Sequence, residues 1–178
     1  MKKLVWIFGL LSGLIVTAMM VYSSTQVYAG SDFKGNEILG FTTIIVAFSF
    51  IYVGIKNYRD KHLGGVINFG KAFKVGLLIA LIASSMYVGV WLIEYYVFMP
   101  DFVERYGECV MKNAREAGAT AAELAQKEEH IASTAKIYET PLGVILMTYT
   151  EILPIGVVIA LISSLILKRK PKAATEVA

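Results

Sequence analysis

The stretch LGVILMTYTEILPIGVVIALISSLIL, residues 142–167, carries a single charged side chain, Glu151. A helix of this length is about 39 Å long, which exceeds the roughly 30 Å thickness of a bilayer's hydrocarbon core. Three further apolar runs occupy residues 4–24, 38–55 and 74–98. The sequence therefore predicts one all-α integral membrane domain over residues 1–170, with four membrane-spanning helices.

The composition of the whole chain agrees with this class of protein. Hydrophobic residues make up 56% and charged residues 17% of the 178 residues, against about 45–50% and about 25% in an average soluble domain. The chain has one cysteine, and its two histidines, His62 and His130, are far apart. We therefore expect no disulfide scaffold, no metal site and no cofactor. The net charge of +3 does not indicate a nucleic-acid partner.

Basic residues are concentrated in three of the five segments outside the apolar runs. The N-terminus, residues 56–74 and the C-terminal tail hold 11 of the 17 lysines and arginines. Residues 25–37 and 99–141 instead contain more acidic than basic side chains. Because basic residues close to helix ends stay on the cytoplasmic side, the pattern predicts a multi-pass protein with both termini in the cytoplasm. Residues 171–178 are expected to form a flexible cytoplasmic tail.

The first apolar run has an alternative interpretation. Lys2 and Lys3, the apolar stretch and the small residue Ala29 together resemble a signal peptide with its cleavage site. The hydrophobic part of a signal peptide is about 7–15 residues long, and this run is longer. We therefore expect a helix that is retained in the mature protein.

Each predicted span carries small residues at helical intervals on one side. Helices in a membrane associate through close backbone approach at such residues, because lipid tails are as apolar as leucine. This favours an antiparallel bundle of the four transmembrane helices, although a given stripe can also face lipid. The stripes are Gly9, Gly13 and Thr17; Gly40, Thr43, Ala47 and Gly54; Gly76, Ala80 and Ala83; and Gly156, Ala160 and Ser164.

Residues 100–140 predict an extracytoplasmic helical hairpin between the third and fourth spans, because the segment is too long for a simple turn. Pro100 is expected at the first position of its first helix, and Gly118 at that helix's end. Thr120 and Glu123 have the spacing of a capping box that begins the second helix. The hairpin is expected to pack on itself, to lie on the bilayer surface or to meet a partner. The predicted apolar face of its first helix comprises Val103, Tyr106, Val110, Ala114 and Ala117.

The stretch GIKNYRDKHLGGVINFGKAFKVG, residues 54–76, is similar to the signature of a bacterial membrane family, domain-of-unknown-function family 4199. Its most specific part is the Gly-Gly pair followed by FGKAF, residues 69–73, and MPDF, residues 99–102, also resembles the family. The likeness covers nearly the whole chain. It implies a bacterial cytoplasmic (inner) membrane protein with four membrane helices, but it implies no activity and no site residues.

The segment GVINFGK, residues 65–71, fits the first seven positions of a phosphate-binding loop, but Ala72 stands where serine or threonine would hold magnesium. Such a loop also needs a preceding strand within an α/β domain. We expect instead a turn and a helix start at the membrane surface. Its basic residues either contact anionic lipid headgroups or only set the topology. The candidate headgroup contacts are Arg59, Lys61, Lys71 and Lys74.

Glu151 is the most informative residue, because it lies near the middle of the fourth predicted span. An ionised acid there costs about 2.5–3.5 kcal/mol, so Glu151 should face the bundle interior, be paired or be protonated. Thr148 lies on the same helix face, and Pro154 removes a backbone N–H close by. An acid beside a broken helix resembles a transporter's binding site. The alternative is an interhelical hydrogen bond that fixes the register of the bundle.

Glu94 lies about one turn inside the outer end of the third span. Ser84, Tyr87, Trp91 and Glu94 share one sector of that helix and predict a polar seam that leads inward from outside. The alternative is that Glu94 extends to the membrane interface among neighbouring aromatic side chains.

These features favour a non-enzymatic membrane component. Besides the lipid bilayer, its partner would be another membrane or extracytoplasmic protein or a second copy of the chain. The alternative is a small transporter or proton-linked channel that uses Glu151 and Glu94. A polar cavity joining the two acids would favour transport, and a dry core would favour a structural role. We expect no enzyme, because the spans contain no HExxH motif, no Ser/His pair and no paired aspartates.

Overall fold

The computed structural model describes residues 1–29 and 36–169, and in this part of the chain the regular elements are all helices, with no named strand. Four of its helices are long and apolar enough to cross a membrane, which confirms the predicted all-α class and the four apolar spans. The predicted tail, residues 171–178, lies outside the described residues. The helices are α1 (Lys2–Tyr28), α2 (Asn36–His62), α3 (Phe69–Ile93), the π-helix η2 (Glu94–Phe98), α4 (Phe102–Glu116), α5 (Ala121–Tyr138) and α6 (Pro141–Leu167).

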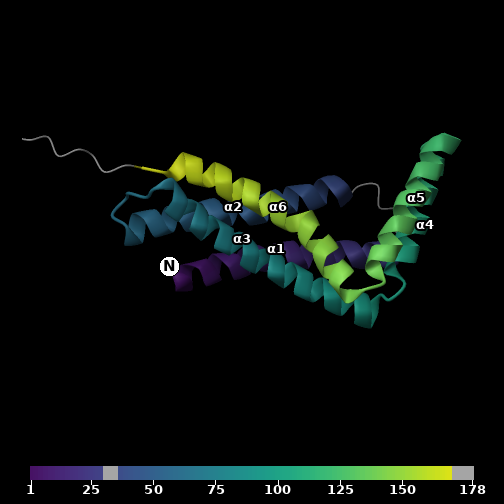
Figure 1. Cartoon of the computed structure of the whole chain (residues 1–178), viewed down its shortest axis with the longest axis horizontal. Coiled ribbons are helices and arrows are strands. Elements are labelled where there is room, and N and C mark those ends of the chain that lie inside the picture. Colours follow the sequence, from purple (N-terminus) through teal and green to yellow (C-terminus); the bar gives the residue numbers. More distant parts are fainter. Residues whose placement is uncertain (30–35, 170–178) are drawn as a thin grey trace, which may run out of the picture.

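The four long helices lie side by side, and consecutive ones run in opposite directions (Figure 1). α1 and α6 pack on opposite sides of α3, and α2 packs against α1, α3 and α6. α4 and α5 stand together at one end, which we call the hairpin end (Figure 1). The other end, which we call the basic end, holds the N-terminus, the connection over residues 63–68 and the last residues of α6 (Figure 1).

The small residues predicted to mediate packing lie between the long helices. A Cβ atom on Gly76 of α3 would lie 2.9 Å from the Cβ of Ala160 on α6, and one on Gly156 would lie equally close to the Cβ of Ala80. A Cβ on Gly9 of α1 would lie 2.7 Å from the Cβ of Ile82 on α3. Close backbone approach at these glycines therefore lets α1 and α6 pack on α3. Gly40 differs, because a Cβ there would meet no atom within 4 Å.

The connection at the basic end is a tight turn followed by a capped helix start. α2 continues to His62, two turns beyond the predicted apolar run, and ends where Gly64 and Gly65 adopt φ angles of +61° and +84°. Glycine tolerates these positive φ angles without a steric penalty. The Asn68 side chain then accepts a hydrogen bond of 2.8 Å from the Lys71 N–H and caps α3. The expected turn and helix start are confirmed, and no strand precedes the glycines within the described residues.

The hairpin follows the sequence prediction closely, except at its beginning. Gly118, with φ of +78°, ends α4, and Thr120 and Glu123 form the predicted capping box. The placement of Pro100 at the first helical position is wrong, because α4 begins two residues later, at Phe102. A proline disfavours helical geometry in the residue before it, and Met99 accordingly has φ of −137°. The chain therefore leaves η2 and turns before α4 can begin.

Candidate functional site

A cleft of about 1250 Å³ lies between the hairpin-end halves of α1, α2, α3 and α6 and is bordered by α4 and α5. Among the described residues, the basic-end half contributes no lining residue. Its described residues pack instead into a continuous apolar core in which Phe48, Ile51, Ile55 and Ile79 are completely buried. The cleft therefore ends near the middle of the long helices and is open only in the hairpin-end half.

Glu151 lines this cleft from α6, and its side chain is exposed to it. Among the described residues Glu151 has no hydrogen-bond or ion-pair partner, so the structure gives it no interhelical bond. Thr148 also lines the cleft, but its hydroxyl donates to the Val144 carbonyl oxygen of the same helix at 2.7 Å. Pro154 lies one turn further on, inside α6, and the helix continues through it. The cleft thus contains an acid with no partner from the described chain.

Glu94 lies at the junction of α3 and η2, and its side chain is buried, with 7% of its surface exposed. The Ser24 hydroxyl on α1 lies 3.1 Å and 3.3 Å from its two carboxylate oxygens. This placement differs from the alternative in which Glu94 extends to an interface. Ser24 itself lines the cleft, whereas Glu94 is not a lining residue. The two candidate acids are therefore not in contact: Glu94 bonds to Ser24, and Ser24 lines the same cleft as Glu151.

The predicted polar seam is only partly continuous with the cleft. Tyr87 and Trp91 line the cleft together with Glu151. Ser84, one turn deeper on α3, is completely buried and is not a lining residue. Trp91 is also nearly buried, and its ring packs edge-on against Phe102 with 4.8 Å between the ring centres. The seam thus provides an aromatic wall at the hairpin end, not an open path through the protein.

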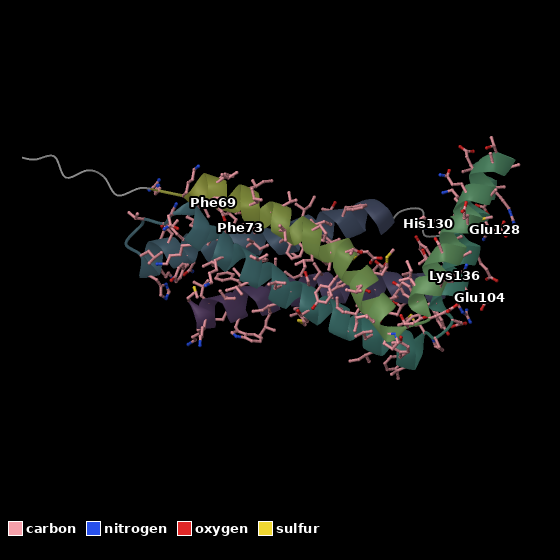
Figure 2. The ribbon with its side chains drawn as sticks, viewed as in Figure 1. Phe69, Phe73, Glu104, Glu128, His130 and Lys136 are labelled. Carbon is pink, nitrogen blue, oxygen red and sulfur yellow. The ribbon has the colours of Figure 1, made fainter. Side chains whose placement is uncertain are left out.

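The hairpin covers the cleft with the apolar face predicted for its first helix, since each residue of that face is a lining residue. α5 packs on α4, where Gly107 lets the Ile131 side chain approach: a Cβ on Gly107 would lie 2.8 Å from the Ile131 Cγ2. α4 also contacts α1, and α5 contacts α6. Figure 2 shows charged and polar side chains carried by the hairpin, including Glu104, Glu128, His130 and Lys136. The hairpin therefore packs both on itself and on the long helices.

The candidate headgroup contacts at the basic end divide into two groups. The Arg59 side chain is buried, with its Nε 2.6 Å from Asp60 Oδ1, and its Nη1 donates to the Leu167 carbonyl oxygen at 3.3 Å. Arg59 therefore joins the end of α2 to the end of α6. The side chains of Lys61, Lys71 and Lys74 are exposed.

Two aromatic side chains lie beside these lysines at the start of α3. The rings of Phe69 and Phe73 stack with 5.9 Å between their centres (Figure 2). Phe69 is exposed and Phe73 is half-buried. This arrangement places apolar rings next to exposed basic groups, which is typical of a surface that meets lipid headgroups.

Sequence reasoning did not identify the contribution of α5 to the candidate site. Tyr138 is nearly buried and lines the cleft, and its ring packs edge-on against Tyr95 with 5.3 Å between the ring centres. Burial, and then the charge of Glu151, raises the pKa of the Tyr138 phenol to about 12. Tyr138 and Glu151 thus line the same cleft from different helices. The apolar spacing of α5 was the available signal, but it does not show which helix that face meets.

Comparison with known proteins gives one result that bears on the whole chain. The sequence model of the family described as "Protein of unknown function (DUF4199)" matches residues 7–169. The comparison with curated proteins and the comparison with solved structures each found no match.

Proposed function

The chain belongs to the DUF4199 family of proteins of unknown function, and on that premise we propose that it is a non-enzymatic binding component of the bacterial inner membrane. In this proposal α1, α2, α3 and α6 form an antiparallel transmembrane bundle. The basic end lies in the cytoplasm and the hairpin end outside. The distribution of basic residues supports this orientation. The molecule that the protein engages would enter the cleft from the extracytoplasmic side.

The observation that carries the proposal is the contrast between the two halves of the long helices. The hairpin-end half contains a cleft of about 1250 Å³, while the basic-end half is filled by buried apolar side chains such as Phe48 and Ile51. Ligand sites are concave, largely apolar and equipped with a few polar groups. A cleft that is closed at its inner end suits binding better than conduction.

The surroundings of Glu151 support a role other than catalysis. A carboxyl group that acts as a general base for nucleophilic catalysis activates a neighbouring hydroxyl or thiol group within hydrogen-bond reach. No side chain of the described residues lies within hydrogen-bond distance of Glu151. Cys109, the single cysteine, accepts only a weak hydrogen bond of 3.6 Å from the Asn113 side chain. Neither residue has the partner that an activated acid or nucleophile needs.

A specific observation favours a second candidate function, a small transporter. Glu151 is an acid without a partner in the cleft, and Pro154 interrupts the hydrogen bonding of α6 close by. Transporters often place a substrate site beside such an interruption. In that case the cleft would be the outward-open state of a moving bundle.

Proton flux into proteoliposomes separates the two candidates. We expect purified wild-type protein to leave the vesicles as tight to a pH gradient as protein-free vesicles. A flux through the wild-type protein that Glu151→Gln abolishes would contradict the binding proposal and establish the transporter. Glu128→Gln, which changes an exposed acid of α5 outside the cleft, is the matched control and should not affect either result.

A further inference from the structure

We propose that the cleft binds an amphipathic organic cation, with its positive group at the Glu151 carboxylate beside the rings of Tyr87, Trp91 and Tyr138. This inference rests on the proposed binding function and adds the chemical class of the ligand. It follows from the charge, the aromatic wall and the apolar wall of the cleft.

The charged side chains of the cleft favour binding of a cation beside Glu151. An ionised carboxylate in low-dielectric surroundings is costly unless it is paired, and the described chain supplies no partner for Glu151. Besides Glu151, the lining acidic and basic side chains are Glu123, Lys127 and His130, all of them from α5, and the other titratable lining side chains are the tyrosines and Cys109. Glu123 is already bonded to Thr120 in the capping box, and Lys127 forms no ion pair with Glu151. A cationic ligand would therefore supply a counter-charge for Glu151 that the described residues do not provide.

The ligand environment favours an organic cation over a metal ion. A protein-bound metal ion needs several ligands, as in the four-coordinate zinc sites or the six-to-eight-coordinate calcium sites. The described residues contain no group of three histidine, cysteine, aspartate or glutamate side chains that could hold one. A single carboxylate is enough to neutralise an ammonium or similar cationic group. The rest of a ligand that carries this group can be apolar.

Three aromatic side chains line the cleft that the positive group would enter. Tyr87 and Trp91 come from α3 and Tyr138 from α5, and all three line the same cleft as Glu151. Trp91 and Tyr138 are held in place by edge-on contacts with Phe102 and Tyr95, at 4.8 Å and 5.3 Å between ring centres. The faces of aromatic rings attract cations, most strongly where water is excluded.

The wall contributed by α1 and α2 suits the apolar part of such a molecule. It contains Val16, Met19, Met20 and Ile44, and Met147 adds to it from α6. Methionine side chains are flexible and polarisable, so they adapt to apolar ligands of irregular shape. The volume of about 1250 Å³ is above the roughly 300–1,000 Å³ of typical small-molecule sites. There is room for a cation with a sizeable apolar portion.

Two probe ions of nearly the same size and shape and of opposite charge test the inference: tetraphenylphosphonium and tetraphenylborate. The protein has two tryptophans, and Trp6, which is 57% exposed, does not line the cleft. A Trp6→Phe variant in phosphatidylcholine nanodiscs therefore reports on Trp91 alone. Titration with each probe, corrected with protein-free nanodiscs, measures binding as a change in Trp91 emission.

We expect tetraphenylphosphonium to give a saturable change and tetraphenylborate to give none. Glu151→Gln should weaken phosphonium binding about 10-fold or more, because the attraction between the carboxylate and the phosphonium charge is lost. Tyr87→Leu should also weaken it, whereas Tyr87→Phe, which keeps the ring, and Glu128→Gln should not. Unchanged thermal stability of the Gln variant shows that it is folded.

Three outcomes would overturn the inference: equal binding of both probes, phosphonium binding that Glu151→Gln leaves unchanged, or no saturable change with phosphonium. Saturable binding of tetraphenylborate, without binding of tetraphenylphosphonium, would refute the proposed preference for cations. It would still support a cleft that binds ligands. Failure of the proposed binding function itself would show instead in the separate proteoliposome experiment, as proton flux that depends on Glu151.

Discussion

The Ser24 hydroxyl on α1 lies 3.1 Å and 3.3 Å from the two carboxylate oxygens of Glu94, which is 70 residues away in the sequence. Both side chains are buried, with 4% and 7% of their surfaces exposed. The contact joins the end of α1 to the junction of α3 and η2, directly behind the wall of the cleft. It therefore holds one side of the candidate site in position.

Replacing Ser24 by alanine should destabilise the fold, because it leaves the buried Glu94 carboxylate without its hydrogen-bond donor. Such a loss typically costs about 1–3 kcal/mol. Thermal or denaturant unfolding in a mild non-ionic detergent would measure it. The matched control is Ser23→Ala on the preceding residue, which is only half-buried and does not bond to Glu94. Equal stability of the two variants would show that the contact does not support the fold.

Close packing of α3 on α6 predicts a strong effect at Gly76. Gly76→Leu should destabilise the protein by about 1–3 kcal/mol, the usual cost of overpacking, because its Cβ alone would lie 2.9 Å from the Ala160 Cβ. Gly89→Leu is the control on the same helix, since a Cβ there meets no atom within 4 Å. Unfolding of the two variants in the same detergent gives the comparison. Similar stabilities would contradict the observed α3–α6 packing.

Asp101 predicts a pH-dependent contribution at the hairpin end. Its carboxylate accepts a hydrogen bond from Arg105 Nε at 2.6 Å, and this bond holds the pKa of Asp101 below its usual value. The contribution is therefore fully present above the unfolded-state pKa of about 3.9 and is lost as the pH falls through the lower folded-state pKa. The melting temperature of Asp101→Asn should thus approach that of the wild type as the pH falls from 7 to 3.

Glu128→Gln, at an exposed position of α5, provides the control for that series. Its difference from the wild type should depend less on pH than that of Asp101→Asn. A constant difference between Asp101→Asn and the wild type over the whole pH range would argue against a stabilising Asp101–Arg105 pair.

The proposed orientation in the membrane can be tested with single cysteines in a Cys109→Ser background. Ala132 on α5 and Lys71 on α3 are both exposed and lie at opposite ends of the molecule. An impermeant thiol reagent added to intact cells should label Ala132→Cys and should label Lys71→Cys only after lysis. The reverse pattern would place the basic end outside and invert the proposed topology.

The sequence was sufficient to predict the four apolar helices, because their length and lack of charge reflect the bilayer directly. It also predicted the capping box at Thr120 and the end of α4 at Gly118, since both depend on local backbone chemistry. The π-helix from Glu94 to Phe98 was not predictable in this way. An apolar run shows neither a change in helix type nor the break that Pro100 imposes after it.

The sequence identified individual residues of the candidate site, but it did not predict how they are arranged in space. The position of Glu151 in an apolar run marked it as a candidate, but whether it has a partner depends on the distances between helices. Gly40 illustrates the limit: it belongs to the small-residue stripe of α2, yet it lines the cleft rather than a helix contact. Small residues allow two helices to approach each other closely. They do not determine over what length of the helices this contact continues.

The most direct test of the cleft around Glu151 is the accessibility of that position from outside the cell. In a Cys109→Ser background, Glu151→Cys should react in intact cells with a small, impermeant, positively charged thiol reagent. Ala160→Cys, completely buried in the packed half of α6, should not react. We expect position 151 to be labelled without lysis. Protection of position 151 until the membrane is dissolved would contradict an outward-opening binding cleft.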